Sequence, residues 1–185
     1  MNKMIKLPLF LSIVCLVATG LLATANAITA PIISQNAVDK QNAGYLSMLN
    51  LTSSAGKTLT PESPSETLTS KGLTGKMVAT NNSDSTVYGI VYDGTVSGFN
   101  GDIVFQIGFV GAVYSGFNCI SNTETPSIGQ AKVLNQLNDY LVGKNATDDF
   151  AVEAAFVTMT AGATYTKTNL IIAIQTAATD YLASI

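Results

Sequence analysis

The first stretch of the chain has charged and apolar positions in the order typical of an export signal. Lys3 and Lys6 precede an apolar run from Leu7 to Leu22, and the small-residue motif Ala25-Asn26-Ala27 follows it. This pattern predicts a secretory signal peptide over residues 1–27, removed on export at the Ala-Asn-Ala site. A retained membrane anchor is the alternative, although about sixteen apolar residues are near the short end for spanning a bilayer.

The next pattern has helical spacing. Between residues 35 and 51, the apolar side chains lie near one face, which predicts an amphipathic helix interrupted at Gly44. Residues 52–76 differ, because Ser, Thr, Gly and Pro dominate them and few large apolar residues occur. A stretch with so little to bury is expected to form a flexible loop or linker.

Strand-like patterns occupy residues 77–120. Residues 86–92 are rich in β-branched and aromatic side chains, and Asp93-Gly94 after them is a strong signal for a two-residue hairpin turn. Residues 102–114 are apolar at both odd and even positions, which predicts a central strand covered on both faces. The tetrapeptide Ser-Gly-Phe-Asn stands at both ends of this run, at 97–100 and 115–118, and we expect each copy to form a turn.

Three helical patterns follow the predicted sheet. Thr125-Pro126 begins the first and Gly143 ends it, while Thr147 can cap the second. The third, from about residue 167 to the last residue, carries an apolar stripe that could pack inside the fold or serve as an interface: Ile171, Ile174, Ala178, Tyr181 and Ile185. This order predicts a single α+β domain over residues 28–185, with a small antiparallel sheet at about residues 77–120 packed by an N-terminal helix and three C-terminal helices.

The composition excludes several classes of function. The chain has 185 residues and no histidine, so it can form no imidazole base, His-dependent triad or histidine-ligated metal site. Without the signal, seven lysines would stand against twelve acidic residues, a net charge of about −5 with no arginine. We therefore expect no nucleic-acid binding. Cys119 would be the one cysteine left, which excludes an intramolecular disulfide.

A few constellations could carry chemistry. Ser54 and Lys57 have the serine-x-x-lysine spacing of some His-free acyl enzymes, but no companion motif accompanies them. Asp149 and Glu153 could pair as acid and base on one helix face, although a solvated first turn explains them better. Three aspartates at predicted turns lack the spacing of a calcium loop: Asp84, Asp93 and Asp102.

These observations leave three hypotheses about function. The first is an exported, non-enzymatic envelope or secreted protein that acts by contact with other envelope proteins or with itself, such as an accessory part of a secretion apparatus. The second is a binder of a small apolar or lipid ligand between sheet and helices. The third is a His-free hydrolase. The sequence points to no catalytic residue, metal or cofactor, and to no transmembrane segment after signal cleavage.

Overall fold

The structure, a computed structural model, describes residues 3–185 and divides into two units after Gln41. The first unit is one helix, α1 (Lys3–Gln41). Its segment Phe10–Ile33 is long and apolar enough to cross a membrane, a property that signal sequences near an N-terminus share. The apolar helix is therefore compatible with the predicted signal peptide, whose removal stays a prediction.

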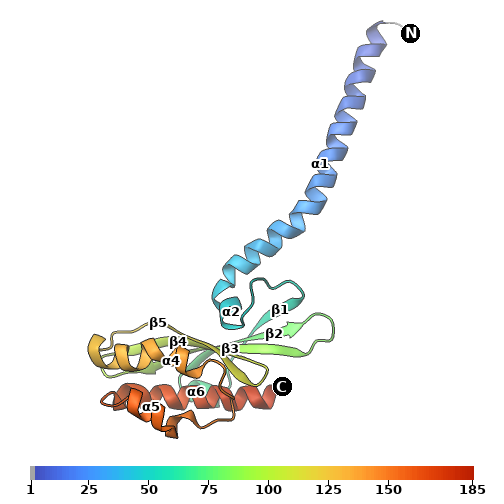
Figure 1. Ribbon diagram of the computed structural model, residues 1–185. Helices are drawn as coiled ribbons and strands as arrows, with labels where there is room; N and C mark the ends of the chain where they lie inside the picture. Colours follow the sequence, from blue (N-terminus) through green and yellow to red (C-terminus); the bar gives the residue numbers. More distant parts are fainter. Residues whose placement is uncertain (1–2) are drawn as a thin grey trace. The chain divides into compact units, whose positions relative to one another are not determined.

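The second unit is built on a five-stranded antiparallel sheet in which neighbours in sequence are neighbours in space (Figure 1). Its strands are β1 (Lys57–Glu62), β2 (Leu73–Asn81), β3 (Val87–Ser97), β4 (Asp102–Val110) and β5 (Val113–Ser121). Short connections between consecutive strands give this meander its order. The predicted antiparallel sheet is confirmed, with more strands than the pattern indicated.

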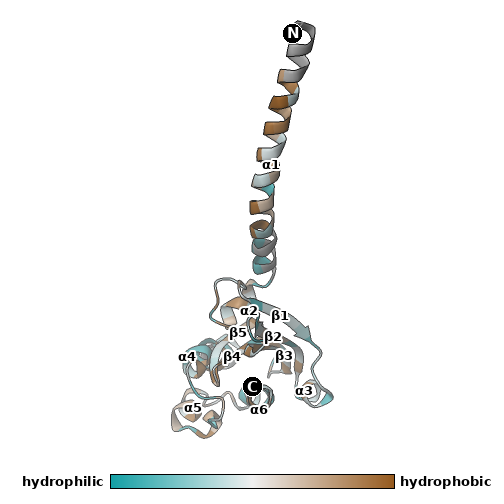
Figure 2. Ribbon diagram, turned by 90° about the vertical axis from the view of Figure 1, so that its right-hand side faces the viewer, coloured by the Kyte–Doolittle hydropathy of each residue, from teal (hydrophilic) through white to brown (hydrophobic). Residues whose placement is uncertain are grey.

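Helices cover both faces of this sheet, which makes the predicted α+β class correct. The short helix α2 (Ala43–Met48) lies over one face, and α6 (Thr164–Ser184) runs along the other (Figure 2). Between β5 and α6 the chain forms the π-helical segment η1 (Pro126–Leu134), α4 (Asn135–Leu141), the 3-10 turn η2 (Phe150–Val152) and α5 (Ala154–Met159). A further short helix, α3 (Glu66–Ser70), joins β1 to β2.

The two faces of the sheet are packed unequally. On the α6 face, alternate side chains of β3 and β4 form a large core with the helix, including Tyr92, Phe109 and Tyr181. The rings of Phe109 and Tyr181 stack with centroids 5.1 Å apart. On the α2 face a smaller buried cluster contains Leu49, Ala79 and Val91. The predicted two-sided burial of the apolar run is thus correct for β4.

The apolar run itself is not one strand. It turns at Gly111-Ala112, whose φ angles are 60° and 64°, so that Val110 pairs with Val113 across a two-residue hairpin. The turn expected at Asp93-Gly94 was wrong, because β3 continues through both residues. Gly94 instead leaves room for the ring of Phe105 on the neighbouring strand, which a Cβ would overlap.

Two further expectations about local structure were wrong. Residues 52–76 are not a structureless loop, since they contain β1, α3 and the start of β2. Backbone hydrogen bonds to β2 order β1, a strand whose side chains are mostly exposed and therefore give no hydrophobic signal. The last helix starts at Thr164 rather than near residue 167, because the break falls at Gly162, whose φ is 87°.

The apolar stripe of the last helix is largely internal. Ile174, Ala178 and Tyr181 are buried against the sheet, Ile171 is half-buried, and Ile185 is exposed at the end of the chain. The periodicity is therefore explained by packing within the fold, and it gives an assembly interface no support.

Candidate functional site

A cavity of about 130 Å³ lies where the first turn of α6 meets the β3–β4 turn and the start of η1. Three separate parts of the chain line it: Phe99; Glu124, Thr125, Ile128 and Gly129; and Gly162, Ala163, Thr164, Tyr165 and Thr166. Backbone geometry brings the parts together. Thr125 and Pro126 start η1 directly after the sheet, and Gly162 reverses the chain into α6. We call this cavity the α6 pocket.

Glu124 is the single charged side chain among the pocket residues, and it is 5% exposed. Its Oε2 accepts a hydrogen bond of 2.7 Å from the hydroxyl of Thr166, and its Oε1 accepts one of 3.3 Å from the backbone N–H of Asn100. A Cβ at Gly98 or at Gly129 would overlap this carboxylate. The two glycines therefore let the acid sit inside the fold, where it ties the β3–β4 turn to α6.

Two aromatic rings border the mouth of the α6 pocket. Phe99 is 73% exposed and Tyr165 is 58% exposed, and their rings meet edge to face with centroids 6.5 Å apart. Solvent-exposed rings of this size lose hydrophobic stabilisation unless a partner covers them. Together with Ile128 they give the pocket an apolar side suited to a planar ligand.

The first turn of α6 adds polar groups to the lining of the α6 pocket. Backbone N–H groups in the first turn of a helix have no intrahelical acceptor, and here no side chain caps α6. The amides of residues 164–166 therefore add to the positive end of the helix dipole. Lys132 donates from Nζ to the carbonyl of Ala161 at 3.0 Å, which holds a positive charge beside the loop that precedes α6.

A second cavity of about 380 Å³ neighbours the α6 pocket along the same helix. Lys71, Val96, Asn169 and Ile172 are among its lining residues. Asn169 donates from Nδ2 to the carbonyl of Ser97 at 2.8 Å, and it lies one helical turn beyond Tyr165. Ser97 and Phe99, two positions apart, thus line different cavities.

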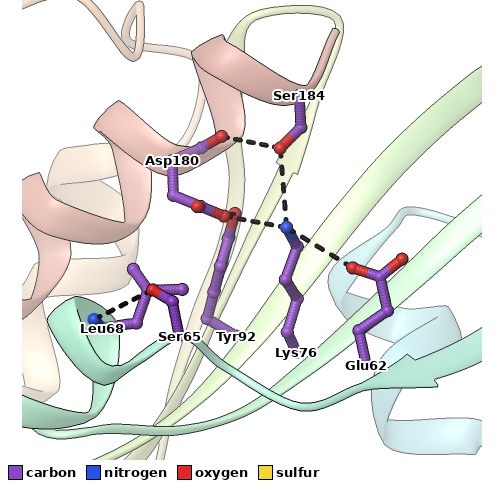
Figure 3. A network of polar contacts seen from close by, with 7 residues as sticks. All are labelled: Glu62, Ser65, Leu68, Lys76, Tyr92, Asp180 and Ser184. Atoms are coloured by element: carbon purple, nitrogen blue, oxygen red, sulfur yellow. Dashed lines mark hydrogen bonds and ion pairs between the residues drawn. The ribbon is translucent and has the colours of Figure 1, made fainter.

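A network of polar contacts at the far end of α6 is structural in character (Figure 3). Lys76 Nζ lies 2.9 Å from Asp180 Oδ2 and 3.6 Å from Glu62 Oε2, and the hydroxyl of Tyr92 donates to Asp180 at 2.6 Å. Burial, and then the bond to Asp180, raises the pKa of Tyr92 far above its usual range. These contacts fasten α6 to β2 and β3.

The structure places Ser54 and Lys57, the pair with serine-x-x-lysine spacing, in separate environments. Ser54 is buried, and the ammonium of Lys57 lies over the ring of Tyr88, 4.3 Å from its centroid. This arrangement gives the acyl-enzyme hypothesis no support.

The proposed carboxylate pair is separated by secondary structure. Asp149 precedes η2 and accepts a bond of 2.7 Å from Gln175, whereas Glu153 follows η2 and pairs with Lys144 at 2.7 Å. The expectation that both lie on one helix face was wrong. The bond from Lys144, followed by that from Tyr140, lowers the pKa of Glu153.

The turn aspartates have separate local partners. Asp84 accepts bonds from Thr86, which lower its pKa, and Asp102 lies 3.4 Å from Ser97 Oγ. Asp93, within β3, accepts 2.8 Å bonds from the hydroxyl of Tyr45 and from Gln106. Burial and Asp93 together raise the pKa of Tyr45 to about 12. Within residues 3–185, no three acidic or cysteine side chains gather as a metal site.

Cys119 is half-buried on β5, and its thiol accepts a hydrogen bond of 3.4 Å from Asn122 Nδ2. Burial raises the pKa of this thiol, which lowers its reactivity at neutral pH.

One known protein family matches part of this chain. A model of the FMN-binding domain family matches residues 98–179, which is slightly less than half of the chain. No curated protein matches the chain. The matched range begins in the β3–β4 turn and ends within α6, so it contains every residue that lines the α6 pocket.

Sequence reasoning did not find this pocket. It explained Thr125-Pro126 as a helix start and assigned no ligand to it. A usable signal was the acidic residue Glu124 directly between the last strand and the first C-terminal helix. Its burial is set by contacts to Asn100 and Thr166, which no local pattern reveals.

Proposed function

We propose that this chain is a flavoprotein domain that binds FMN at the α6 pocket. The observation that carries the proposal is the family match to residues 98–179, and the exposed aromatic rings of the α6 pocket favour it over a second cavity inside the same range, lined between Tyr114 and Thr179. The FMN-binding family match covers residues 98–179, and the whole lining of the α6 pocket falls inside it. The apolar N-terminal helix supports export of this flavoprotein from the cytoplasm, as its signal-like pattern suggests.

The polar side of the α6 pocket suits the phosphate of FMN. A phosphate group is favoured at a helix N-terminus because free backbone N–H groups and the helix dipole both point toward it. Here the uncapped amides of residues 164–166 and the hydroxyl of Thr164 would hold it. The ammonium of Lys132, fixed beside Ala161, adds a positive charge to that side.

The apolar side suits the isoalloxazine ring. Phe99, Tyr165 and Ile128 would contact its faces and edges, as aromatic and aliphatic side chains do in cofactor sites. The cavity of about 130 Å³ is smaller than the roughly 300 Å³ at which ligand pockets usually begin. Only part of FMN would therefore be enclosed, and the remainder would cover the exposed rings at the mouth.

When bound, FMN supplies one-electron and two-electron transfer, and the protein supplies binding, orientation and electrostatics. The residues of the α6 pocket can orient the cofactor and shield part of it from water. We propose no protein acid or base, which is consistent with an electron carrier rather than an enzyme with its own catalytic group.

The test is a titration of FMN with the full chain. Quenching of flavin fluorescence and isothermal calorimetry measure the binding. We expect saturable binding of one FMN per chain, weakened at least tenfold in the double variant Phe99→Ala with Tyr165→Ala. The matched control is Tyr88→Ala, which removes an aromatic side chain outside the matched range and should leave binding unchanged. Absence of saturable binding by the unaltered chain would refute the proposal.

The contact function expected from the sequence is a separate hypothesis. An electron carrier in the envelope would need a partner that reduces or oxidises it, so other envelope proteins remain the partners that we propose. Cross-linking of the exported protein in cells, followed by mass spectrometry, tests this idea. Recovery of the uncross-linked monomer alone would count against it.

A further inference from the structure

We propose that Glu124 lowers the reduction potential of the flavin bound in the α6 pocket. This inference rests on the proposed function, and it concerns a property that binding alone does not determine. It assigns a role to Glu124, the single buried acidic side chain of the pocket. The ion pairs found among residues 3–185 do not include this residue.

The carboxylate of Glu124 is held in place without a cation. Ion pairs among residues 3–185 join Lys76 to Glu62 and Asp180, and Lys144 to Glu153. Lys132, the nearest lysine in sequence, donates to the carbonyl of Ala161 instead. The partners of Glu124 are the hydroxyl of Thr166 and the amide of Asn100, so two hydrogen-bond donors hold this carboxylate in place of a cation.

The position of this carboxylate favours an effect on the ring. Its Oε1 accepts from Asn100, the residue that follows Phe99, and its Oε2 accepts from Thr166, the residue that follows Tyr165, so the carboxylate lies next to both residues of the aromatic border. The pocket is small, and a group enclosed in it lies within a few side-chain lengths of the acid. At that range and with little water, two charges interact far more strongly than in bulk solvent.

Reduction of FMN at neutral pH adds two electrons and one proton from solvent, and leaves one more negative charge on the ring system. A nearby carboxylate opposes this gain of charge, so the protein binds reduced FMN less tightly than oxidised FMN. The reduction potential falls by the corresponding amount. An uncharged isostere at the same position removes the repulsion and keeps a hydrogen-bond acceptor.

The experiment is a spectroelectrochemical titration of the FMN-loaded full chain and of Glu124→Gln, with redox mediators. We expect the variant to favour reduced FMN about tenfold more, which is an upward shift of about 30 mV for a two-electron couple. Asp139→Asn is the matched control, because it removes the same charge from an exposed site on α4 and should leave the potential unchanged.

A second variant tests the inference in case Glu124→Gln does not fold. Ile128 lines the pocket but is 42% exposed, so Ile128→Lys places a positive charge there with little effect on the core. It should raise the potential in the same direction.

The outcomes distinguish failure of FMN binding from failure of the proposed effect on the reduction potential. If the unaltered chain binds no FMN, the proposed function falls and this inference with it. If FMN binds and a folded Glu124→Gln leaves the potential unchanged, the inference alone is wrong. If Glu124→Gln does not fold, an unchanged potential in Ile128→Lys overturns the inference. The same holds if Glu124→Gln tightens FMN relative to riboflavin at an unchanged potential, since Glu124 would then act on the phosphate.

Discussion

The same four residues, Ser-Gly-Phe-Asn, adopt two different structures in this protein. At residues 97–100 they form the turn between β3 and β4, and Phe99 is 73% exposed. At residues 115–118 they lie inside β5, and Phe117 is 4% exposed. One copy borders the proposed cofactor pocket, and the other belongs to the core.

Their surroundings explain the difference. The first copy is followed by Gly101, whose φ of 134° suits glycine alone, and Asn100 exchanges bonds of 2.8 and 2.7 Å with Thr123. The second copy is followed by residues that pair with β4, and Phe117 stacks on Phe105 with ring centroids 5.8 Å apart. Long-range pairing, and not the tetrapeptide, decides which conformation each copy takes.

The largest expected contrast is in stability. Phe117→Ala should lower the free energy of unfolding by about 3–5 kcal/mol, because it empties a packed core site. Phe99→Ala should change the free energy of unfolding by about 0.5 kcal/mol or less, as at most exposed positions. Urea denaturation followed by circular dichroism measures both. Equal losses in the two variants would contradict the assignment of the copies to pocket and core.

The glycines of the two Ser-Gly-Phe-Asn copies, Gly98 and Gly116, provide the next contrast. Gly98→Ala should cost about 1–3 kcal/mol, because the new methyl group meets the carboxylate of Glu124, which the fold holds from two sides. Gly116→Ala meets the sulfur of Met48 at 3.1 Å, near the end of a flexible side chain that can move. We expect a smaller loss there. Thermal unfolding ranks the stabilities of the two variants. The reverse order would mean that the carboxylate of Glu124 does not limit the space at Gly98.

The exposed phenylalanine, Phe99, also provides a test of FMN binding. Phe99→Ala should weaken FMN about tenfold, or about 1.4 kcal/mol, by removing one aromatic contact to the ring. The control is Ile120→Ala on β5, an exposed apolar side chain outside the pocket, which should bind FMN normally. Titration of flavin fluorescence gives both affinities. A normal affinity for FMN in Phe99→Ala would mean that this ring does not contact the cofactor.

The asparagines give the smallest contrast. Asn100→Ala should lower the free energy of unfolding by about 1 kcal/mol, because its Nδ2 donates to the carbonyl of Thr123 at 2.8 Å. Asn118 is exposed on β5, and its replacement by alanine should cost about 0.5 kcal/mol or less. Differential scanning calorimetry resolves the two. A larger loss for Asn118→Ala would mean that the β3–β4 turn does not depend on this bond.

Part of the site could have been anticipated from the sequence. Thr125-Pro126 correctly marked the place where η1 starts, and this place borders the α6 pocket. The aromatic border could not be anticipated, because Phe99 and Tyr165 are 66 positions apart and meet only through the packing of α6 on the sheet. Local pattern carries no information about such a meeting.

The sequence by itself determined the properties that depend on composition and on periodicity. It excluded histidine chemistry, indicated an export-like N-terminus, and predicted an α+β fold, because hydrophobic spacing reflects which faces are buried. Only the tertiary structure decided that Asp93-Gly94 continues a strand, that Tyr181 is internal, and that Glu124 lies in a pocket. These outcomes depend on strand register and on contacts between distant segments, and such contacts override local preferences.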